Sequence, residues 1–486
     1  MIAISNKEHW LIEQSKSSSE LLAIITSSER IDYKQYFEKS FQYFCLLIDM
    51  GVKKDDRVGI LSNNSKEFLF LVNAIWFCGA TAVPLNTRLT ENELLCQIEN
   101  IGISFLFIED RLYNFKKEIP GKIVLLSRLN QLKRNSENYF IHDFDINRNA
   151  LIMFTSGSTG KSKAAVHTFQ SIYESTSALN EFINLTIDDI WLASLPFYHI
   201  GGFMIFCRSL ISKSKIAIPD SLKYDDIKTA IQKFEPTHIS FVSTTLYRLI
   251  EEKFKPKKNI KYVFLGGGPL DTSLCDNAIK EGWNIVKVYG STETCSMVTA
   301  LKSKDYILKP ESTGKPLKNV DIKIIGINGE FLNANEKGEI AIKSKTLFKD
   351  YVFSERSGRY IDEYFLTGDY GWLDEDGYLY VESRREDIVI TGGENVSIKE
   401  VENAIKQLRE VEDVYVFPEK DKEWGQSISA AVVLNNEISL AEIKRELISY
   451  IASYKIPKRF YFVKEIPRTE LGKIDKEKLI KLIKEQ

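Results

Sequence analysis

The chain has 486 residues, of which 44% are hydrophobic, enough to bury a large core and to divide into two or more domains. Its 65 basic and 67 acidic residues give a net charge of -2, which excludes the broad basic surface typical of proteins that bind nucleic acids or anionic membranes. We therefore expect a globular protein in which an anionic ligand is bound by a few residues at its own site and not by a broad basic surface.

The first part of the chain alternates between predicted strands and helices. Repeated alternation of this kind predicts a layered α/β domain with largely parallel sheets. Residues 128–149 show little periodicity and are interpreted as a connector. The predicted elements are a covering helix within 20–50, strand 57–61, helix 66–78, strand 81–85, helix 91–100, strand 104–108 and strand 122–126.

The alternation resumes after a short apolar run at 150–153. Glycines and small polar residues follow several of these later strands, and ligands of open α/β sheets bind at the carboxyl ends of the strands. A section rich in predicted strands and turns then covers 322–381. The predicted elements before it are helix 168–182, strand 190–195, helix 224–234 and strands 238–242, 261–265 and 284–289.

A charged run at 383–387 predicts a linker, and the roughly 100 residues after it suffice for a small α+β domain. We therefore predict an N-terminal domain over 1–383, a hinge at 384–387 and a small, mobile C-terminal domain over 388–486. The elements predicted in the last domain are helix 398–408, strands 411–418 and 428–434, helix 440–453 and strand 459–463.

The chain shows no sign of secretion or of a membrane span. The N-terminal residues lack the basic start and apolar core of a signal peptide, and the longest apolar stretch, 68–85, contains Asn73, Gly79 and Pro84. The cysteines have no CxxC spacing, so we expect buried, reduced thiols and a cytoplasmic protein. The cysteines are Cys45, Cys78, Cys96, Cys207, Cys275 and Cys295.

The stretch FTSGSTGKSK at 154–163 has the composition of a phosphate-binding loop. Its small residues leave backbone N–H groups and hydroxyls free to surround an anion, while Lys161 and Lys163 supply positive charge. The P-loop of kinases and GTPases requires a glycine where this chain has Thr155, so a different nucleotide chemistry is predicted. The alternative is a flexible surface loop rich in serine and glycine.

Further motifs follow this loop, and their order resembles that of the acyl-adenylate-forming superfamily of AMP-binding acyl-CoA synthetases, adenylation domains and luciferases. Within the superfamily, WLASLPFYHI at 191–200, three glycines at 266–268 and GGEN at 392–395 are most similar to the o-succinylbenzoate:CoA ligases of menaquinone biosynthesis. The motifs are TSGSTGKSK at 155–163, LPFYH at 195–199, LGGGP at 265–269, YGSTE at 289–293, TGD at 367–369, RRED at 384–387, GGEN at 392–395 and PRTELGK at 467–473.

The resemblance implies a reaction in two steps. A carboxylate attacks the α-phosphate of ATP to give an acyl-AMP and pyrophosphate, and the thiol of coenzyme A then displaces AMP. Because the first step brings two anions together, it needs preplaced cations and hydrogen-bond donors rather than a protein nucleophile. The implied co-substrates are ATP, Mg²⁺ and CoA with a small carboxylic acid. We expect no prosthetic group, no bound nucleic acid and no membrane span. The resemblance is compatible with a homo-oligomer.

The resemblance also implies roles for residues that match the superfamily motifs. The loop contacts the β- and γ-phosphates, Glu293 binds Mg²⁺, and Lys473 is the catalytic lysine at the α-phosphate and acyl oxygen. Asp369 and Arg384 contact the ribose. Taken alone, Glu293 would be a surface carboxylate and the Thr-Gly-Asp motif an ordinary turn. The residues expected to bind ATP or AMP are Thr155, Ser156, Gly157, Ser158, Thr159, Gly160, Lys161, Lys163, Gly267, Gly268, Pro269, Tyr289, Gly290, Ser291, Thr292, Asp369 and Arg384.

Three residues are expected at the acyl site. By resemblance His199 positions or gates the acyl group and the thiol, and Gly290 lines the same space; a histidine in an apolar setting is otherwise often a core residue. Arg208 lies in an apolar segment, where an unpaired cation is costly, so we infer that it pairs with a substrate carboxylate. The alternatives for Arg208 are an internal ion pair and a surface arginine with a buried stem.

The C-terminal domain of the superfamily is a lid that rotates between the two steps. The resemblance identifies Glu386 as the hinge and Gly393 as part of the tunnel for the pantetheine arm of CoA, where a side chain would block the thiol. Ser383 replaces the glycine that usually precedes the ribose-binding arginine, a departure that bears on the geometry of the hinge.

Other functions remain open from the sequence. The protein could be a fatty-acyl-CoA or aryl-CoA synthetase, although Arg208 suits a dicarboxylate better than a fatty acid. It could also be a free-standing adenylation domain that acts with a carrier protein. A catalytically inactive nucleotide-binding protein is disfavoured, because Lys161, Glu293, Asp369 and Lys473 are all present.

Overall fold

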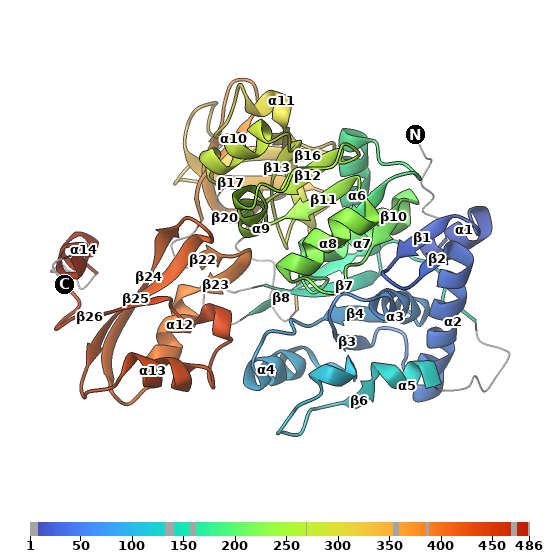
Figure 1. Cartoon of the computed structure of the whole chain (residues 1–486), viewed down its shortest axis with the longest axis horizontal. Coiled ribbons are helices and arrows are strands. Elements are labelled where there is room, and N and C mark those ends of the chain that lie inside the picture. The colour runs from blue at the N-terminus through green and yellow to red at the C-terminus, as the bar shows by residue number, and fades with distance from the viewer. Residues whose placement is uncertain are drawn as a thin grey trace.

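The computed structural model describes residues 8–131, 140–155, 162–268, 270–352, 359–384, 388–467 and 474–484. These residues form four β-sheets with helices packed against them (Figure 1). Three sheets are built from residues before 385, and the fourth belongs to the C-terminal domain. The predicted class, a layered α/β domain followed by a separate small domain, is confirmed.

The first sheet contains the predicted βαβ units. Its strands run in the order β18-β8-β7-β4-β3-β5-β6, and the five strands from β7 to β6 are parallel. The pairs β7–β8 and β8–β18 are antiparallel, so the sheet is mixed. The bounds are β3 Arg57–Leu61, α3 Lys66–Phe77, β4 Thr81–Pro84, α4 Glu91–Ile101, β5 Phe105–Ile108, η1 Asp110–Leu112, β6 Lys122–Leu125, α5 Leu126–Gln131, β7 Asn149–Thr155, β8 Lys163–Thr168 and β18 Asp350–Tyr351.

The second sheet has the order β15-β14-β13-β12-β11-β9-β10-β1-β2 and is also mixed. Its strands are β1 Leu22–Ile25, β2 Arg30–Asp32, β9 Ile190–Leu192, β10 Lys215–Ala217, β11 His238–Phe241, β12 Tyr262–Leu265, β13 Ile285–Ser291, β14 Ser296–Lys302 and β15 Lys315–Pro316. The associated helices are α1 Trp10–Ser17, α2 Tyr33–Met50, α6 Phe169–Ile183, α7 Ile200–Ser212, α8 Tyr224–Phe234, α9 Ser243–Glu251, α10 Thr272–Lys280 and α11 Ser303–Tyr306.

The start of the chain differs from the prediction. Residues 22–32 form a hairpin instead of the first part of a helix, and β1 pairs in parallel with β10, where Ile24 lies opposite Ile216. The helix begins only at Tyr33 because Asp32 and Gln35 form a reciprocal capping box at that point. The edge of the second sheet is therefore built from the beginning of the chain.

Helices α3, α6 and α7 contribute to one core that also includes residues of both sheets. Trp76 of α3 stacks on Phe206 of α7 with ring centroids 5.8 Å apart, and Trp191 of β9 belongs to the same core. Aromatic pairs of this kind add about 0.5–1.5 kcal/mol to the stabilisation from buried area. The two sheets and the helices that they share thus form one rigid support for the loops at the strand ends.

The predicted β-rich section is confirmed as a third sheet with the order β16-β17-β20-β19, in which β21 pairs with β20. All of its pairs are antiparallel. The strands are β16 Val320–Ile325, β17 Gly338–Ser344, β19 Tyr360–Ile361, β20 Tyr364–Leu373 and β21 Leu379–Arg384.

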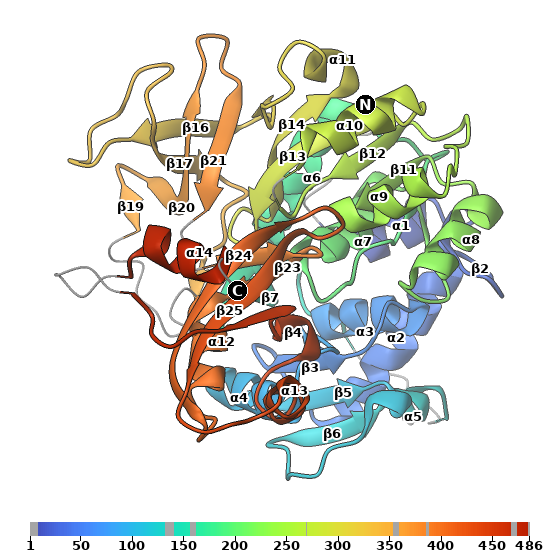
Figure 2. The same ribbon diagram turned by 60° about the vertical axis from the view of Figure 1, so that its left-hand side comes forward.

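The C-terminal domain has its own sheet and its own core. Figures 1 and 2 show this domain beside the N-terminal domain, with α14 on its outer side. The predicted helix 440–453 is too long: α13 ends at Leu447, and the Ser449 hydroxyl donates to the Glu446 carbonyl. The elements are β22 Ile388–Thr391, β23 Glu394–Ser397, α12 Ile398–Ile405, β24 Val411–Asp421, β25 Gly425–Leu434, α13 Leu440–Leu447, η2 Ser453–Lys455, β26 Arg459–Phe462 and α14 Lys476–Lys484.

Two predictions about the whole chain can be compared with the structure. All six cysteines are free thiols, and five are buried as expected, whereas Cys96 on α4 is exposed. Among the described residues, no helix has both the length and the apolar character needed to cross a membrane.

Candidate active site

The predicted nucleotide residues meet at the carboxyl end of β12 and β13. Gly266 to Gly268 follow β12, and Tyr289 lies near the end of β13. The Tyr289 hydroxyl donates to Asp369 Oδ2 at 2.8 Å, and Asp369 is 4% exposed. Asp369 lies opposite Arg384 across the β20–β21 pair. The structure thus brings together residues that the sequence assigns to ATP or AMP binding, including the ribose residue Asp369, from three parts of the chain.

Gly290 has a structural reason to be glycine. A Cβ atom at this position would lie 2.0 Å from the Ser296 carbonyl oxygen, because β13 and β14 approach closely where their register shifts. The turn that follows contains Ser291, Thr292 and Glu293, and the Thr294 hydroxyl accepts a hydrogen bond from the Ser291 N–H at 2.8 Å. The tight turn therefore fixes the place of Glu293.

The two described ends of the phosphate loop are neighbours in the first sheet. Thr155 ends β7 and Lys163 begins β8, and the two residues lie opposite each other in the antiparallel pair. The Lys163 ammonium lies 5.2 Å from the centroid of the Tyr351 ring. The other predicted loop residues, 156–161, lie outside the described residues.

Tyr351 links the phosphate loop to Glu293. Its hydroxyl donates to Glu293 Oε1 at 2.6 Å, while its strand β18 pairs with β8 directly after Lys163. The Phe348 N–H donates to the Glu293 carbonyl at 2.8 Å. Tyr351 was missed in the sequence because neither motif spacing nor composition distinguishes it from the other tyrosines.

The carboxylate of Glu293 is the donor that the predicted Mg²⁺ site requires. Within the described ranges, no group of three or more His, Cys, Asp or Glu side chains is arranged to hold a metal ion. Mg²⁺ commonly needs only one or two protein carboxylates, since phosphate oxygens and water complete its octahedron. A single carboxylate beside the phosphate loop, with one oxygen engaged by Tyr351, fits that pattern of binding.

We expect the Tyr351→Phe variant to bind Mg·ATP roughly tenfold more weakly, since hydrogen bonds to charged groups contribute about 1.5–3 kcal/mol. Isothermal titration with Mg·ATP would measure the change. The matched control is Tyr364→Phe, because Tyr364 donates to Asp321 in the third sheet in the same manner. Equal affinities of the two variants would show that the Tyr351 hydroxyl does not support the metal site.

His199 is held at the start of α7, where it occupies the N-cap position without a capping hydrogen bond from its side chain. Gly202 allows the first turn of α7 to approach the preceding loop, since a Cβ atom there would lie 2.0 Å from the Pro196 carbonyl oxygen. His199 Nε2 lies 3.0 Å from Glu394 Oε2 of the C-terminal domain. His199 thus faces the other domain instead of the hydrophobic core.

Glu394 joins the two domains and was not identified as a site residue in the sequence, although it belongs to the GGEN motif. It is 6% exposed, and Arg88 Nη1 of the N-terminal domain donates to its Oε1 at 3.0 Å. Burial alone would raise the pKa of Glu394, but His199 and Arg88 outweigh burial and lower the pKa. The carboxylate therefore stays ionised between the two domains at neutral pH.

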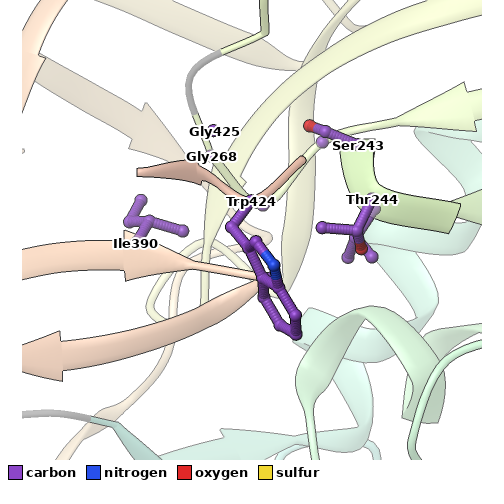
Figure 3. A pocket seen from close by; sticks show the side chains of 11 residues that line it. Ser243, Thr244, Gly268, Ile390, Trp424 and Gly425 are labelled. Atoms are coloured by element: carbon purple, nitrogen blue, oxygen red, sulfur yellow. The ribbon is translucent and has the colours of Figure 1, made fainter. Parts of the chain in front are cut away.

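A small pocket, open to solvent, lies between the two domains (Figure 3). Gly393 has φ 83°, and a Cβ atom there would lie 2.4 Å from Val242 Cγ1. Gly392 has φ 59° and approaches the ring of Trp424 in the same way. Any side chain at Gly393 would push into this pocket. The pocket is lined by Val242, Ser243, Thr244, Gly266, Gly267, Gly268, Ile390, Gly392, Gly393, Trp424 and Gly425.

Arg208 lies deep in α7 and is 1% exposed. Its guanidinium carbon lies 5.7 Å from the centroid of the Trp191 ring, and its Nε and Nη2 atoms have no hydrogen-bond partner among the described residues. Burial lowers the pKa of Arg208 to about 10, so the side chain remains a cation at neutral pH. This arrangement contradicts the alternative of a surface arginine.

Some predicted site residues cannot be compared with the structure. Ser156, Gly157, Ser158, Thr159, Gly160, Lys161, Pro269, Glu386 and Lys473 lie outside the described residues, as does the side chain of Arg384. Their roles stay predictions. The described part of the candidate site contains Tyr289, Asp369, Glu293 and the inter-domain pocket, and the roles of these residues also stay predictions.

Comparison with known proteins identifies the family. The sequence profile of the AMP-binding enzyme family matches residues 11–352, and that of the AMP-binding enzyme C-terminal domain matches residues 400–473. The 2-succinylbenzoate–CoA ligase of Bacillus subtilis strain 168 is 32% identical over 477 residues, which cover 97% of both chains. The enzyme of the same name from Staphylococcus aureus strain MSSA476 is 30% identical over 97% of this chain and 99% of its own.

Solved structures of the Bacillus subtilis o-succinylbenzoate CoA synthetase match this fold. A double mutant bound to the product analogue OSB-NCoA has a TM-score of 0.92 at 31% identity and covers 97% of this chain and 98% of its own. The complex with the acyl-adenylate intermediate OSB-AMP has a TM-score of 0.76 at the same identity, with 98% of each chain covered. At nearly the same identity and coverage, the present structure therefore matches the product-analogue complex more closely than the acyl-adenylate complex.

Proposed function

The chain belongs to the AMP-binding enzyme family, and from this premise we propose that it joins o-succinylbenzoate to coenzyme A in two ATP-dependent steps, as an AMP-forming acid:CoA ligase of menaquinone biosynthesis. The observation that carries the proposal is the inter-domain pocket at Gly393, close to the His199–Glu394 pair, in a chain arranged like a relative bound to OSB-NCoA. The substrates are an aromatic acid, ATP and CoA.

The first step forms the acyl-adenylate. Tyr289 and Asp369 hold the adenosine, the loop from Thr155 to Lys163 holds the β- and γ-phosphates, and Glu293 holds Mg²⁺ with support from Tyr351. Bound Mg²⁺ would neutralise charge on the phosphate oxygens. Lys473 supplies a further cation at the α-phosphate, so that the carboxylate can approach and pyrophosphate can leave.

The second step forms the thioester. The pantetheine arm of CoA lies in the pocket beside Gly393, and the sulfur attacks the acyl carbonyl while AMP leaves. Glu394 Oε2 lies 3.0 Å from His199 Nε2, and this contact positions the imidazole beside the acyl group. Arg88 keeps the Glu394 carboxylate ionised and oriented.

Arg208 is the residue that we propose for the second carboxylate of the acid. A buried guanidinium with two atoms lacking a described partner is an unfavourable arrangement unless an anion binds there. o-Succinylbenzoate has a second carboxylate that can fill this role, whereas a fatty acid does not. In this proposal Arg208 is the residue that makes the enzyme prefer a dicarboxylic acid to a fatty acid.

A panel of acids, each assayed with and without CoA, tests the function. We expect pyrophosphate release and a CoA thioester with o-succinylbenzoate. Preference for fatty or simple aryl acids would overturn the substrate, and acyl-adenylate formation without transfer to CoA would indicate an adenylation domain that serves a carrier protein. No pyrophosphate release with any acid would indicate an inactive nucleotide-binding protein.

We also propose that the domains rotate about Glu386 between the two steps. Proline fixes φ near -65° and removes the N–H group, so Glu386→Pro restricts rotation without removing any ligand contact. We expect the rate of thioester formation to fall several-fold more than the rate of pyrophosphate release in single-turnover assays. The Glu386→Ala variant is the control, and an equal loss of both rates in Glu386→Pro would contradict the hinge.

The location and the partners complete the proposal. The six free thiols suit a reducing compartment, and we propose the cytoplasm. The enzyme acts on small molecules.

A further inference from the structure

Lys455 lies at the junction of the two domains, away from the pocket. Its side chain is 8% exposed, and its ammonium contacts Glu93 Oε1 of the N-terminal domain at 2.5 Å and Glu400 Oε1 of its own domain at 2.7 Å. Burial alone would lower the pKa of Lys455, but Glu400 and Glu93 outweigh burial and raise the pKa. The ammonium is therefore charged and shared between a carboxylate on each side.

Glu93 has two roles at once. Its Oε2 accepts hydrogen bonds from the Thr90 N–H at 2.7 Å and from the Thr90 hydroxyl at 2.8 Å, and the first of these, with the Glu93 N–H donating to the Thr90 hydroxyl, forms the capping box of α4. Its Oε1 remains for Lys455. The side chain of Glu93 is 13% exposed, so salt in the solvent screens the contact with Lys455 only weakly.

Each of the two charges keeps a partner in its own domain if the domains separate. Lys455 retains Glu400, and Glu93 retains its hydrogen bonds to Thr90. Breaking a buried ion pair is costly chiefly when it leaves one charge without a partner. This contact can therefore form and break repeatedly, as a domain movement requires.

Neighbouring contacts join the same surfaces. The Arg88 guanidinium lies 4.5 Å from the centroid of the Tyr454 ring, and the Asn92 amide donates to the Ser449 carbonyl at 3.4 Å. The segment 88–93 of the N-terminal domain therefore receives residues 449–455 of the C-terminal domain. Between these two segments, the Lys455–Glu93 contact is an ion pair with a full charge of each sign.

We propose that the Glu93–Lys455 ion pair selectively stabilises the domain arrangement that forms the thioester. This inference rests on the proposed two-step function and adds two positioning residues to the second step. The relative's product-analogue complex has a TM-score of 0.92 to this chain and its acyl-adenylate complex one of 0.76, so the structure that contains the ion pair resembles the product-analogue complex more closely. Removing the pair then slows transfer to CoA and leaves adenylate formation unchanged.

The test uses the Glu93→Gln variant of the full chain. Glutamine at this position still accepts the capping hydrogen bonds, so the substitution removes only the charge that Lys455 contacts. Acyl-adenylate supplied to the enzyme and mixed rapidly with CoA reports transfer in a single turnover, and pyrophosphate release reports the first step. We expect the rate of transfer to CoA to fall roughly tenfold, a typical size for a coupling effect. The rate of pyrophosphate release should stay within about twofold of the wild-type rate, which is smaller than a typical coupling effect.

Glu442→Gln is the matched control. Glu442 occupies the same capping-box position in α13, where its Oε2 accepts from the Ser439 N–H at 3.0 Å and from the Ser439 hydroxyl at 2.6 Å. This variant should retain both rates. Lys455→Gln should show the defect of Glu93→Gln, and the double variant should be no slower than Lys455→Gln, because both substitutions remove one shared contact.

The outcomes separate the inference from the proposed function. Wild-type transfer in Glu93→Gln, or an equal loss of both steps, would overturn the role of the ion pair. A wild-type enzyme that makes no CoA thioester would overturn the proposed function instead. If Lys455→Gln lowers the midpoint of thermal unfolding, its rates cannot be interpreted. The Glu93→Gln variant keeps the capping hydrogen bonds of α4, so its rates still test the role of the ion pair.

Discussion

Replacing Lys473 with methionine is expected to slow acyl-adenylate formation by a factor of about 10²–10³, the usual effect of removing one preplaced group that stabilises a transition state. By family resemblance this lysine supplies positive charge where the carboxylate meets the α-phosphate. Helix α14, which begins three residues later, lies on the outer side of the C-terminal domain in the present arrangement (Figure 2). Transfer to CoA from supplied acyl-adenylate should therefore keep most of its rate.

Single-turnover measurements of the two steps would test this separation. Lys478→Met is the control, because Lys478 is a lysine of α14 five positions after Lys473 in the sequence and contacts only Asp475 among the described ion pairs. It should preserve both rates. Equal slowing of both steps in Lys473→Met would show that the lysine supports the fold or both reactions, contrary to the assigned role.

Replacing Arg208 with leucine is expected to raise the Michaelis constant for o-succinylbenzoate about a hundredfold, since truncating one partner of a buried charge pair costs about 2–5 kcal/mol. The Michaelis constant for ATP should not change, because Arg208 contacts Trp191 in the interior and no described nucleotide residue. Steady-state kinetics with each substrate varied in turn would measure both constants.

Two further expected results distinguish a role of Arg208 in substrate binding from a role in the core. Arg208→Lys keeps the charge but loses the planar, forked donor, so it should lie between wild type and Arg208→Leu. The leucine variant should unfold at the same or a higher temperature, because an apolar side chain replaces a buried cation without a described partner. Unchanged kinetics in Arg208→Leu would show that the guanidinium belongs to the core and not to the acyl site.

Much of the candidate site could be predicted because its residues lie in short sequence motifs. Several of these motifs follow strands whose ends lie side by side in the fold. Tyr289 and Asp369 are far apart in the sequence, but each lies in a strand and belongs to a short motif that could be recognised. The 2.8 Å hydrogen bond between them places the two motifs side by side, as a shared nucleotide site requires. Helix 224–234 was predicted with its observed bounds because its apolar spacing is regular and Pro236 follows shortly after its end.

The residues that the sequence did not reveal are those that depend on tertiary contacts. Glu394 contacts His199 only because the domains meet in one arrangement, and Tyr351 contacts Glu293 only because β18 joins a sheet built nearly 200 residues earlier. The same holds for the strand β8 after the phosphate loop, whose short apolar pattern was not recognised. Neither spacing nor propensity carries information about such long-range pairings.

The pairing of β1 with β10 affects how the protein is made. Ile24 lies opposite Ile216, so the first strand leaves the ribosome roughly 10–40 s before its neighbour, at about 5–20 residues per second. During that interval the β1–β2 hairpin has an open edge, and an open strand edge can pair with other chains. The α2 helix, which begins directly after β2 and packs against α3, provides an early local partner for this region. This edge of the second sheet nevertheless stays incomplete until α7 and β10 have been made, so the start of the chain can join the sheet only after the middle of the N-terminal domain has been synthesised.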